Sequence, residues 1–302
     1  MSLKWIPLAN NMISKHFLKS FTTICNSPEP NLANAALLIS TLEYPNLDVS
    51  KSLNQLDQMG IKALRRLSDS TSDDPLTQIN LLNDYIFKEE GFKGNKKNYD
   101  DPRNHLLNAV IERRTGIPIT LGIVYIEIAQ RAGVRVEGIN FPGHFLLRIP
   151  YRTGAADTVD TDLIVDPFNA GSILSETDCK LLLQHNLGTQ TIFDRSSLAQ
   201  ATKRQIIIRI LMNLKRLYIK TRFFDQGRTI IDLLLAINPS ATSELRDRGL
   251  LAYHLNDFSA ALRELESYLR FTSQREDQLK NSEYAEIWEH IKTLRRRVAN
   301  LN

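Results

Sequence analysis

Apolar residues recur at helical spacing through the first ninety-five residues of the chain. The pattern predicts four helices, within residues 6–21, 32–44, 53–67 and 76–86. Asn31 stands before the second of these helices, and Asp73 or Asp74 stands before the fourth. Short polar side chains of this kind cap helix N-termini by accepting a backbone N–H. This part of the chain is therefore predicted to be all-helical.

The next thirty residues predict two further helices. The first spans residues 104–114 and stops at Gly116. The second begins at Pro118, because proline suits the first helical turn, and it ends at Gly133, which suits a C-terminal cap. This second helix is apolar on most of its sides, so we expect it to be buried.

After Gly133 the spacing of apolar residues changes from helical to alternating. Three strands are predicted, over residues 134–139, 143–149 and 163–168, with a polar connection over 153–161. His144 falls on the second strand, and Asp166 falls near the end of the third. Short strands joined in succession predict an antiparallel meander packed on the buried helix.

The C-terminal part is predicted to be helical throughout. Two copies of a helix–turn–helix pattern follow each other at an offset of 35, which pairs Phe223 with Phe258. This resembles tetratricopeptide repeats, whose period is near 34. A last helix around residues 284–294 is predicted to cap the array. Two copies are few for a free-standing array, so we expect the other end to pack on the preceding domain.

The 302 residues have an ordinary globular composition, with 42% hydrophobic and 24% charged residues. Gly and Pro are scattered without a period, which excludes collagen-like and low-complexity classes. No run of 18 apolar residues occurs, so we expect no membrane association. A secretory signal is not evident, and Cys25 and Cys179 form neither a disulfide framework nor a zinc-ligand pair. A cytoplasmic protein is therefore predicted.

The charge is unevenly distributed along the chain. Residues 195–302 carry 19 Lys+Arg and 12 Asp+Glu, a net of +7, whereas residues 1–194 carry 19 and 22, a net of −3. A basic tail could attract nucleic acid. However, acidic residues are interspersed, and the one cluster, Arg295–Arg297, lies at the end of a helix, where cations are favoured. We interpret the tail as a solvated helical surface and do not expect a nucleic-acid partner.

Three motifs in order carry a family resemblance: GIPITL at 116–121, PGHFLLR at 142–148 and DPFNAG at 166–171. They resemble a transglutaminase-like (papain-like) core, and more closely the bacterial SirB family, which joins such a core to tetratricopeptide repeats. The resemblance covers about residues 30–190 and extends to the tail by architecture. It implies an α+β fold, predominantly α-helical, with a small antiparallel sheet followed by a helical repeat domain. The predicted domains are 1–27, 28–194 and 195–302.

The resemblance also implies a catalytic arrangement that can be checked residue by residue. In such cores a cysteine starts the central helix, a histidine lies on the next strand and an aspartate on the strand after it. His144 and Asp166 match the last two positions. The cysteine position falls at Pro118 or Ile119, and neither residue has a nucleophilic atom. Thr120 is the nearby hydroxyl, and we interpret it as satisfying the first helical turn.

The sequence therefore predicts a pseudoenzyme, in which His144 and Asp166 are a remnant pair with a structural or ligand-recognition role. We expect a protein-binding or adaptor module that takes a protein or peptide partner through its repeats, with the link to regulation implied by the SirB resemblance. The alternative is an amide-bond hydrolase or transferase that uses His144 and Asp166 with an unidentified nucleophile. The chain has no phosphate-binding loop and no H-E-x-x-H motif, so no cofactor and no metal are predicted.

Overall fold

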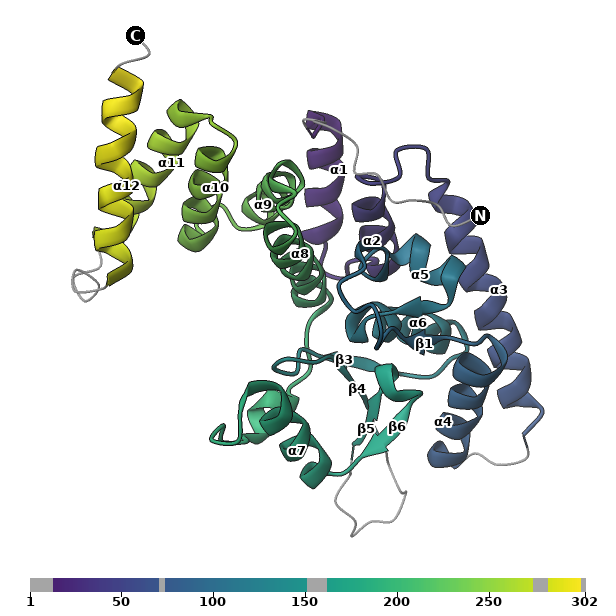
Figure 1. Cartoon of the computed structure of the whole chain (residues 1–302). Helices are drawn as coiled ribbons and strands as arrows, with labels where there is room; N and C mark the ends of the chain where they lie inside the picture. Colours follow the sequence, from purple (N-terminus) through teal and green to yellow (C-terminus); the bar gives the residue numbers. More distant parts are fainter. Residues whose placement is uncertain (1–12, 71–73, 151–161, 274–281, 300–302) are drawn as a thin grey trace. The chain divides into compact units, whose positions relative to one another are not determined.

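The computed structural model describes residues 13–70, 74–150, 162–273 and 282–299 (Figure 1). Contacts between residues divide the chain into two compact units. The first, called the core unit below, comprises Ser27–Ile210. The second, called the tail unit, comprises Met1–Asn26 together with Leu211–Asn302.

The core unit is built around one buried helix, α6 (Pro118–Arg131), in which every residue from 118 to 129 is buried. Four α-helices of this unit precede it in the chain: α2 (Leu32–Ser40), α3 (Val49–Ser68), α4 (Pro75–Asn83) and α5 (Leu107–Arg113). Helices α2, α3 and α5 pack against α6. The prediction of a buried central helix that starts at Pro118 is confirmed, and its end at Arg131 precedes Gly133 as expected.

Helix capping in this unit follows the sequence. Asn31 accepts the backbone N–H of Asn34 at 2.9 Å and starts α2. Asp74 accepts that of Thr77 at 2.9 Å and starts α4, while Asp73 lies outside the described residues. Helix α4 runs directly into a π-helical turn over Asp84–Glu89.

The predicted meander is present but has four strands in the described residues. Strands β3 (Glu137–Ile139), β4 (Leu146–Ile149), β5 (Leu163–Asp166) and β6 (Ser172–Leu174) form one antiparallel sheet in that order. β6 was not predicted, and the polar connection over 153–161 lies outside the described residues. Two short strands, β1 (Lys93–Gly94) and β2 (Thr115–Gly116), form a separate parallel pair that the pattern also did not predict.

The sheet lies against α6 through the ring of Phe145. A Cβ atom on Gly122 of α6 would lie 2.5 Å from this ring, and one on Gly138 of β3 would lie 2.7 Å from it. Real Cβ atoms do not approach so closely, so both positions need glycine for this contact. The contact fixes β4 relative to α6, and with it the neighbouring residue His144.

One helix contributes residues to both units. This helix, α8, spans Lys203–Lys220, and its first residues belong to the core unit. In the core unit it follows α7 (Glu176–Leu187) and a short 3₁₀ turn over Arg195–Leu198.

The tail unit contains the predicted pairs of helices. The first pair is the tail part of α8 with α9 (Phe224–Ile237), and the second is α10 (Thr242–His254) with α11 (Phe258–Ser273). The unit also contains α12 (Ser282–Ala299) and α1 (Lys15–Cys25). Helix α12 packs on α11 with Ile287, Ile291 and Leu294 buried, as expected of a capping helix. Helix α1 is the described part of the helix predicted within residues 6–21, and it packs on α9.

The predicted repeat offset of 35 is wrong by one residue. α8 and α10 end at Lys220 and His254, and α9 and α11 begin at Phe224 and Phe258, so the offset is 34. The equivalent turn residues Arg222 and Asn256 both adopt the left-handed conformation, with φ of 61° and 60°. Phe258 therefore corresponds to Phe224 and not to Phe223, because the shape of the turn and not the nearest aromatic residue sets the register.

The architecture is thus a mostly helical α+β core followed by helical repeats, as predicted. Over the residues that the structure covers, no helix is both long and apolar enough to cross a bilayer.

Candidate functional site

His144 lies in a tight turn before β4, not on the strand as predicted. The strand begins only at Leu146. The backbone N–H of His144 donates to the carbonyl of Phe141 at 3.0 Å, which closes the turn. Gly143 has φ of +71°, and a Cβ there would lie 2.7 Å from Cβ of Asn186. Both the positive φ and the close approach of Asn186 require glycine at position 143. The turn therefore orients the imidazole independently of the strand.

Asp166 ends β5 and starts a 3₁₀ turn over Pro167–Asn169. Its Oδ1 accepts the backbone N–H of Phe168 at 2.9 Å, and its Oδ2 accepts the side-chain amide of Asn169 at 2.8 Å. The residue is 1% exposed. The carboxylate is therefore held in place by hydrogen bonds within its own turn, independently of its other partners.

The two residues meet, with Nε2 of His144 lying 2.9 Å from Oδ1 of Asp166. A carboxylate only accepts hydrogen bonds, so we assign the proton to Nε2. Burial by itself would raise the pKa of Asp166, but the hydrogen bond and charge of His144 and the bonds from Asn169 and Phe168 hold that pKa below its ordinary value. Nδ1 of His144 makes no hydrogen bond to any described residue.

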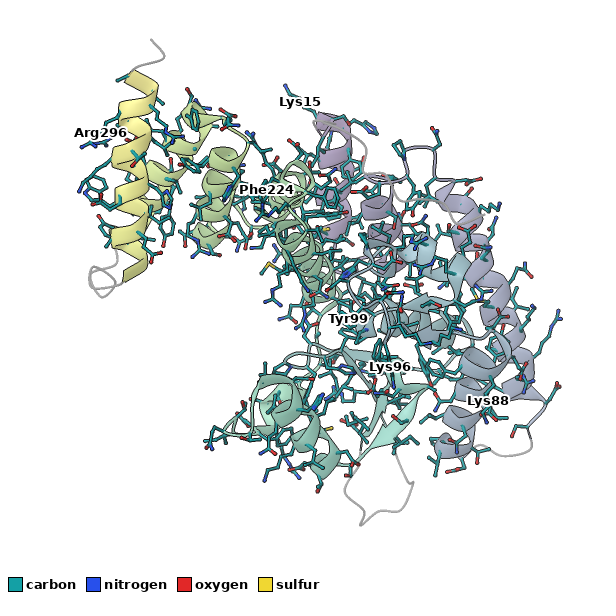
Figure 2. All side chains as sticks on the ribbon, in the orientation of Figure 1. Lys15, Lys88, Lys96, Tyr99, Phe224 and Arg296 are labelled. Carbon is teal, nitrogen blue, oxygen red and sulfur yellow. The ribbon has the colours of Figure 1, made fainter. Side chains whose placement is uncertain are left out.

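Two aromatic rings, Phe168 and Tyr99, form a series of edge contacts from buried His144 to the surface. Phe168 meets His144 edge to face at a centroid distance of 6.0 Å, and it meets Tyr99 in the same way at 6.0 Å. Tyr99, labelled in Figure 2, is 45% exposed. Burial of its hydroxyl raises the pKa of Tyr99, while the charge of Arg209 opposes the rise. We call Tyr99 and Phe168 the aromatic rim.

Arg209 adds a cation beside this rim. Its Nη2 donates to the carbonyls of His144 at 3.3 Å and Phe141 at 3.4 Å, so the first turns of α8 support the histidine turn. Our sequence analysis missed Arg209 and Tyr99 because they lie 65 and 45 residues from His144 in the chain. A signal for Phe168 was available, since it belongs to the DPFNAG motif.

The hydroxyl of Thr120 both donates and accepts a hydrogen bond within the fold. It donates to the carbonyl of Asn104 at 2.7 Å and accepts the backbone N–H of Ile117 at 3.1 Å. Thr120 is 1% exposed. Asn104 is itself buried and donates to the carbonyls of Asn98 and Tyr99 at 2.8 and 3.1 Å. Thr120 thus joins the start of α6 to the loop that carries Tyr99.

The Cys179 thiol lies where it does not ionise readily. Cys179 on α7 is 0% exposed, and burial, with the nearby carboxylates Asp178, Glu176 and Asp166, raises its pKa to about 11. A thiol needs to lose its proton to act as a nucleophile. Cys25 is also 0% exposed and lies in the tail unit. Pro118, at the position where the resemblance places the family's cysteine, is buried at the first turn of α6.

His105 is a second buried histidine that the sequence did not single out. Burial lowers its pKa to about 4, although Asp100 and Asp101 oppose the shift. Its Nδ1 has no hydrogen-bond partner among the residues that the structure describes. Within the described ranges no three His, Cys, Asp or Glu side chains converge as a metal site would require.

Comparison with known proteins matches two parts of the chain to two family models. A family model described as the transglutaminase-like superfamily matches residues 50–212, and a tetratricopeptide-repeat model matches residues 214–286. The chain is 37% identical to the UPF0162 protein of Xylella fastidiosa (strain Temecula1) over 269 residues, which covers 88% of this chain and 89% of that protein.

Two further relatives are more distant. Protein SirB1 of Salmonella typhimurium is 26% identical over 228 residues, covering 76% of this chain and 80% of SirB1. F-box only protein 21 of Homo sapiens is 30% identical over 182 residues, covering 59% of this chain but 28% of that protein. The predicted resemblance to a SirB-type family is confirmed.

Proposed function

This chain belongs to the transglutaminase-like superfamily, and from that premise we propose that it is a protein-binding adaptor without catalytic turnover. The observation that carries the proposal is the start of α6. Buried Pro118 stands there, and the neighbouring hydroxyl of Thr120 is already bonded to Asn104 and Ile117. The His144–Asp166 pair then serves to hold the turns at β4 and β5 and to contact a ligand at the aromatic rim.

The repeats are the proposed surface for the protein partner. Helical repeats form curved surfaces that bind peptides, and a tetratricopeptide model matches this region. Ile219 on α8 and Tyr253 on α10 occupy equivalent positions at the offset of 34. Ile219 is 37% exposed and Tyr253 is partly exposed. Recurrence of a large, partly exposed apolar side chain at one repeat position supports a shared binding surface.

We further propose that the protein acts in the cytoplasm, as a component of a regulatory assembly. Cys25 and Cys179 are both buried and are not joined in a disulfide, which suits a reducing compartment. The regulatory setting derives from the SirB-type resemblance.

Site-specific photo-crosslinking in living cells tests the adaptor role in the full chain. A crosslinking residue placed at position 219 or 253 is expected to capture the same partner from both positions. A crosslinker at Lys180, an exposed residue on α7, is the control. Absence of a shared product, or equal capture from position 180, would contradict binding by the repeats.

An amide-bond hydrolase or transferase is the second candidate, and one observation favours it. Nδ1 of His144 is left without a bond among the described residues while Asp166 orients the ring from behind, which is the arrangement of a general base. Release of ammonia from a glutamine-containing peptide, and hydrolysis of that peptide, should be measured for wild type, His144→Ala and the exposed control His185→Ala. Turnover that is lost only with His144→Ala would overturn the non-catalytic proposal.

A further inference from the structure

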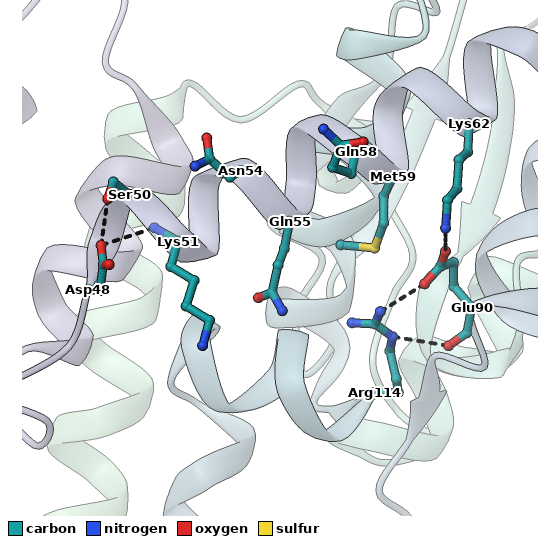
Figure 3. A pocket seen from close by; sticks show the side chains of 10 residues that line it. All are labelled: Asp48, Ser50, Lys51, Asn54, Gln55, Gln58, Met59, Lys62, Glu90 and Arg114. Carbon is teal, nitrogen blue, oxygen red and sulfur yellow. Dashed lines mark hydrogen bonds and ion pairs between the residues drawn. The ribbon is translucent and has the colours of Figure 1, made fainter.

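A polar groove lies along α3, formed only by residues of the core unit (Figure 3). Its volume is about 410 Å³. Three parts of the chain line it: the first four turns of α3 with their cap, Glu90 after the π-helical turn, and Arg114 at the end of α5. It shares no lining residue with the His144 site or with the repeats. We call it the α3 groove.

One wall of the α3 groove is rigid. Arg114 adopts the left-handed conformation with φ of 55°, which is uncommon for a residue with a side chain. Its Nε donates to the carbonyl of Glu90 at 3.1 Å, its Nη2 to Oε2 of Glu90 at 2.8 Å, and its guanidinium lies 4.7 Å from the ring centre of Phe92. The hydroxyl of buried Tyr85 donates to Oε1 of Glu90 at 2.9 Å. A left-handed backbone conformation like that of Arg114 persists where surrounding contacts hold it in place.

The groove has more positive charge than its own carboxylates neutralise. Glu90 is shared between Arg114 and Lys62, whose Nζ lies 3.7 Å from it. Asp48 caps α3, accepting from Ser50 and from the backbone of Lys51. The Lys51 ammonium makes no hydrogen bond or ion pair within the described residues. Three cations against two occupied carboxylates favour an anionic ligand.

The other wall presents amides in a row. Lys51, Gln55, Gln58 and Lys62 are spaced four, three and four residues apart, so they share one face of α3. Each glutamine side chain offers both a donor and an acceptor, like a peptide group, and neither is hydrogen-bonded within the described residues. Met59, which is 3% exposed, supplies an apolar floor. The row is about 16 Å long, which matches about five residues of extended chain.

We propose that the α3 groove binds an extended acidic peptide segment. A carboxylate of that segment pairs with Lys51, and its backbone bonds the amides of Gln55 and Gln58. The site lies on the core unit, so it stands independently of partner binding by the repeats. If binding at the α3 groove fails, partner binding by the repeats can still be measured in the same full-length protein, and the reverse also holds.

The test uses methyl NMR on the full chain labelled at the methionine methyl groups. The probe is an acetylated and amidated six-residue peptide of alternating Glu and Ala, and the matched peptide carries Gln in place of Glu. The acidic peptide is expected to shift the Met59 resonance saturably and to leave Met212 of the tail unit unchanged. Met59→Leu identifies the resonance.

Charge-reversal variants locate the contact. Lys51→Glu is expected to weaken binding of the acidic peptide at least about fivefold, because an attraction is replaced by a repulsion. Lys180→Glu, the same change on exposed α7 of the same unit, is expected to leave binding unchanged. No Met59 shift at millimolar peptide overturns the proposal. So does an equal response to the glutamine peptide or to inorganic phosphate, or unchanged binding by Lys51→Glu.

Discussion

Charged side chains join distant parts of the chain in the core unit but nearby helices in the tail unit. In the core, Glu127 accepts the backbone N–H of Ala33 across 94 residues, and Arg131 bonds Asp57 across 74. In the tail, three ion pairs each span 29 residues. These pairs are Lys215–Glu244, Arg228–Asp257 and Glu266–Arg295.

Other ion pairs between tail helices span 16 or 32 residues, so each of these pairs serves the interface between neighbouring helices of the repeats. Repeat arrays derive stability from such nearest-neighbour interfaces, so damage to one should remain local. The core has irregular, long-range contacts around α6, and damage there should affect strands and helices together. The following measurements test that difference, beginning with the largest expected effect.

Lys215→Ala should destabilise the tail unit by about 3–5 kcal/mol, because it leaves the buried carboxylate of Glu244 without a counter-ion. Nζ of Lys215 lies 2.8 Å from Glu244 and 2.9 Å from Asp247, and Lys215 is 5% exposed. Hydrogen exchange should accelerate in α10 and in the tail part of α8 while α6 stays protected. Equal acceleration in α6 would contradict local damage in the tail.

Acid should weaken the core through His105. Its pKa is about 4 in the folded protein against an ordinary 6.5, so the unfolded chain binds the extra proton first as the pH falls. The stabilising effect of the neutral ring is complete above pH 6.5 and is lost between 6.5 and 4. Urea unfolding should therefore show a loss of about 2 kcal/mol between pH 7 and pH 5.

His105→Leu should remove most of this loss, whereas His185→Leu, on an exposed part of α7, should keep it. The tail histidines His254 and His290 are exposed, so the same acidification should spare α10 and α12 in hydrogen exchange. Acid sensitivity that persists in His105→Leu would assign the effect to another group.

Thr120→Val should destabilise the core by about 1–2 kcal/mol, because the carbonyl of Asn104 and the N–H of Ile117 lose their partner inside the fold. Thr120→Ser keeps the hydroxyl and should cost less. Denaturant midpoints of the two variants measure the difference. Equal midpoints would show that the hydroxyl does not contribute to holding the start of α6.

Lys292→Ala should change stability by about 0.3 kcal/mol, the smallest effect of the series. Its 2.7 Å pair with Glu289 lies on one turn of α12 and is solvent-exposed. Thermal unfolding of this variant beside Lys215→Ala compares a surface pair with a buried one in the same unit. A loss of stability above about 1 kcal/mol in Lys292→Ala would contradict the expected difference between an exposed and a buried ion pair.

Much of the fold was predictable because it depends on local features. Pro118 and Gly133 mark the two ends of α6, and Asn31 and Asp74 cap their helices, since each acts within one helical turn. The predicted domain boundaries at 27/28 and 194/195 stay a prediction about independent folding. The structure adds that α8 contributes residues to both compact units.

The candidate site was predictable only in part. The motifs placed His144 and Asp166, but the turn at Gly143 moved the histidine off the strand, and the repeat register differed by one residue because of the left-handed Arg222 and Asn256. Neither turn has a hydrophobic period, so pattern analysis did not detect it. Strand β6 has only three residues and no buried ones, which leaves it without an alternating signal.

The sequence by itself determined the helices, the meander and the missing cysteine at the start of α6, because periodicity, caps and residue identity are local properties. The tertiary structure alone decided that Phe168 links Tyr99 to His144, that Arg209 bonds the histidine turn, that the Thr120 hydroxyl bonds Asn104, and that Lys51 and Arg114 line one groove. These groups come from segments far apart in the chain. Their meeting depends on how whole elements pack around α6, which the spacing of residues within any one segment does not specify.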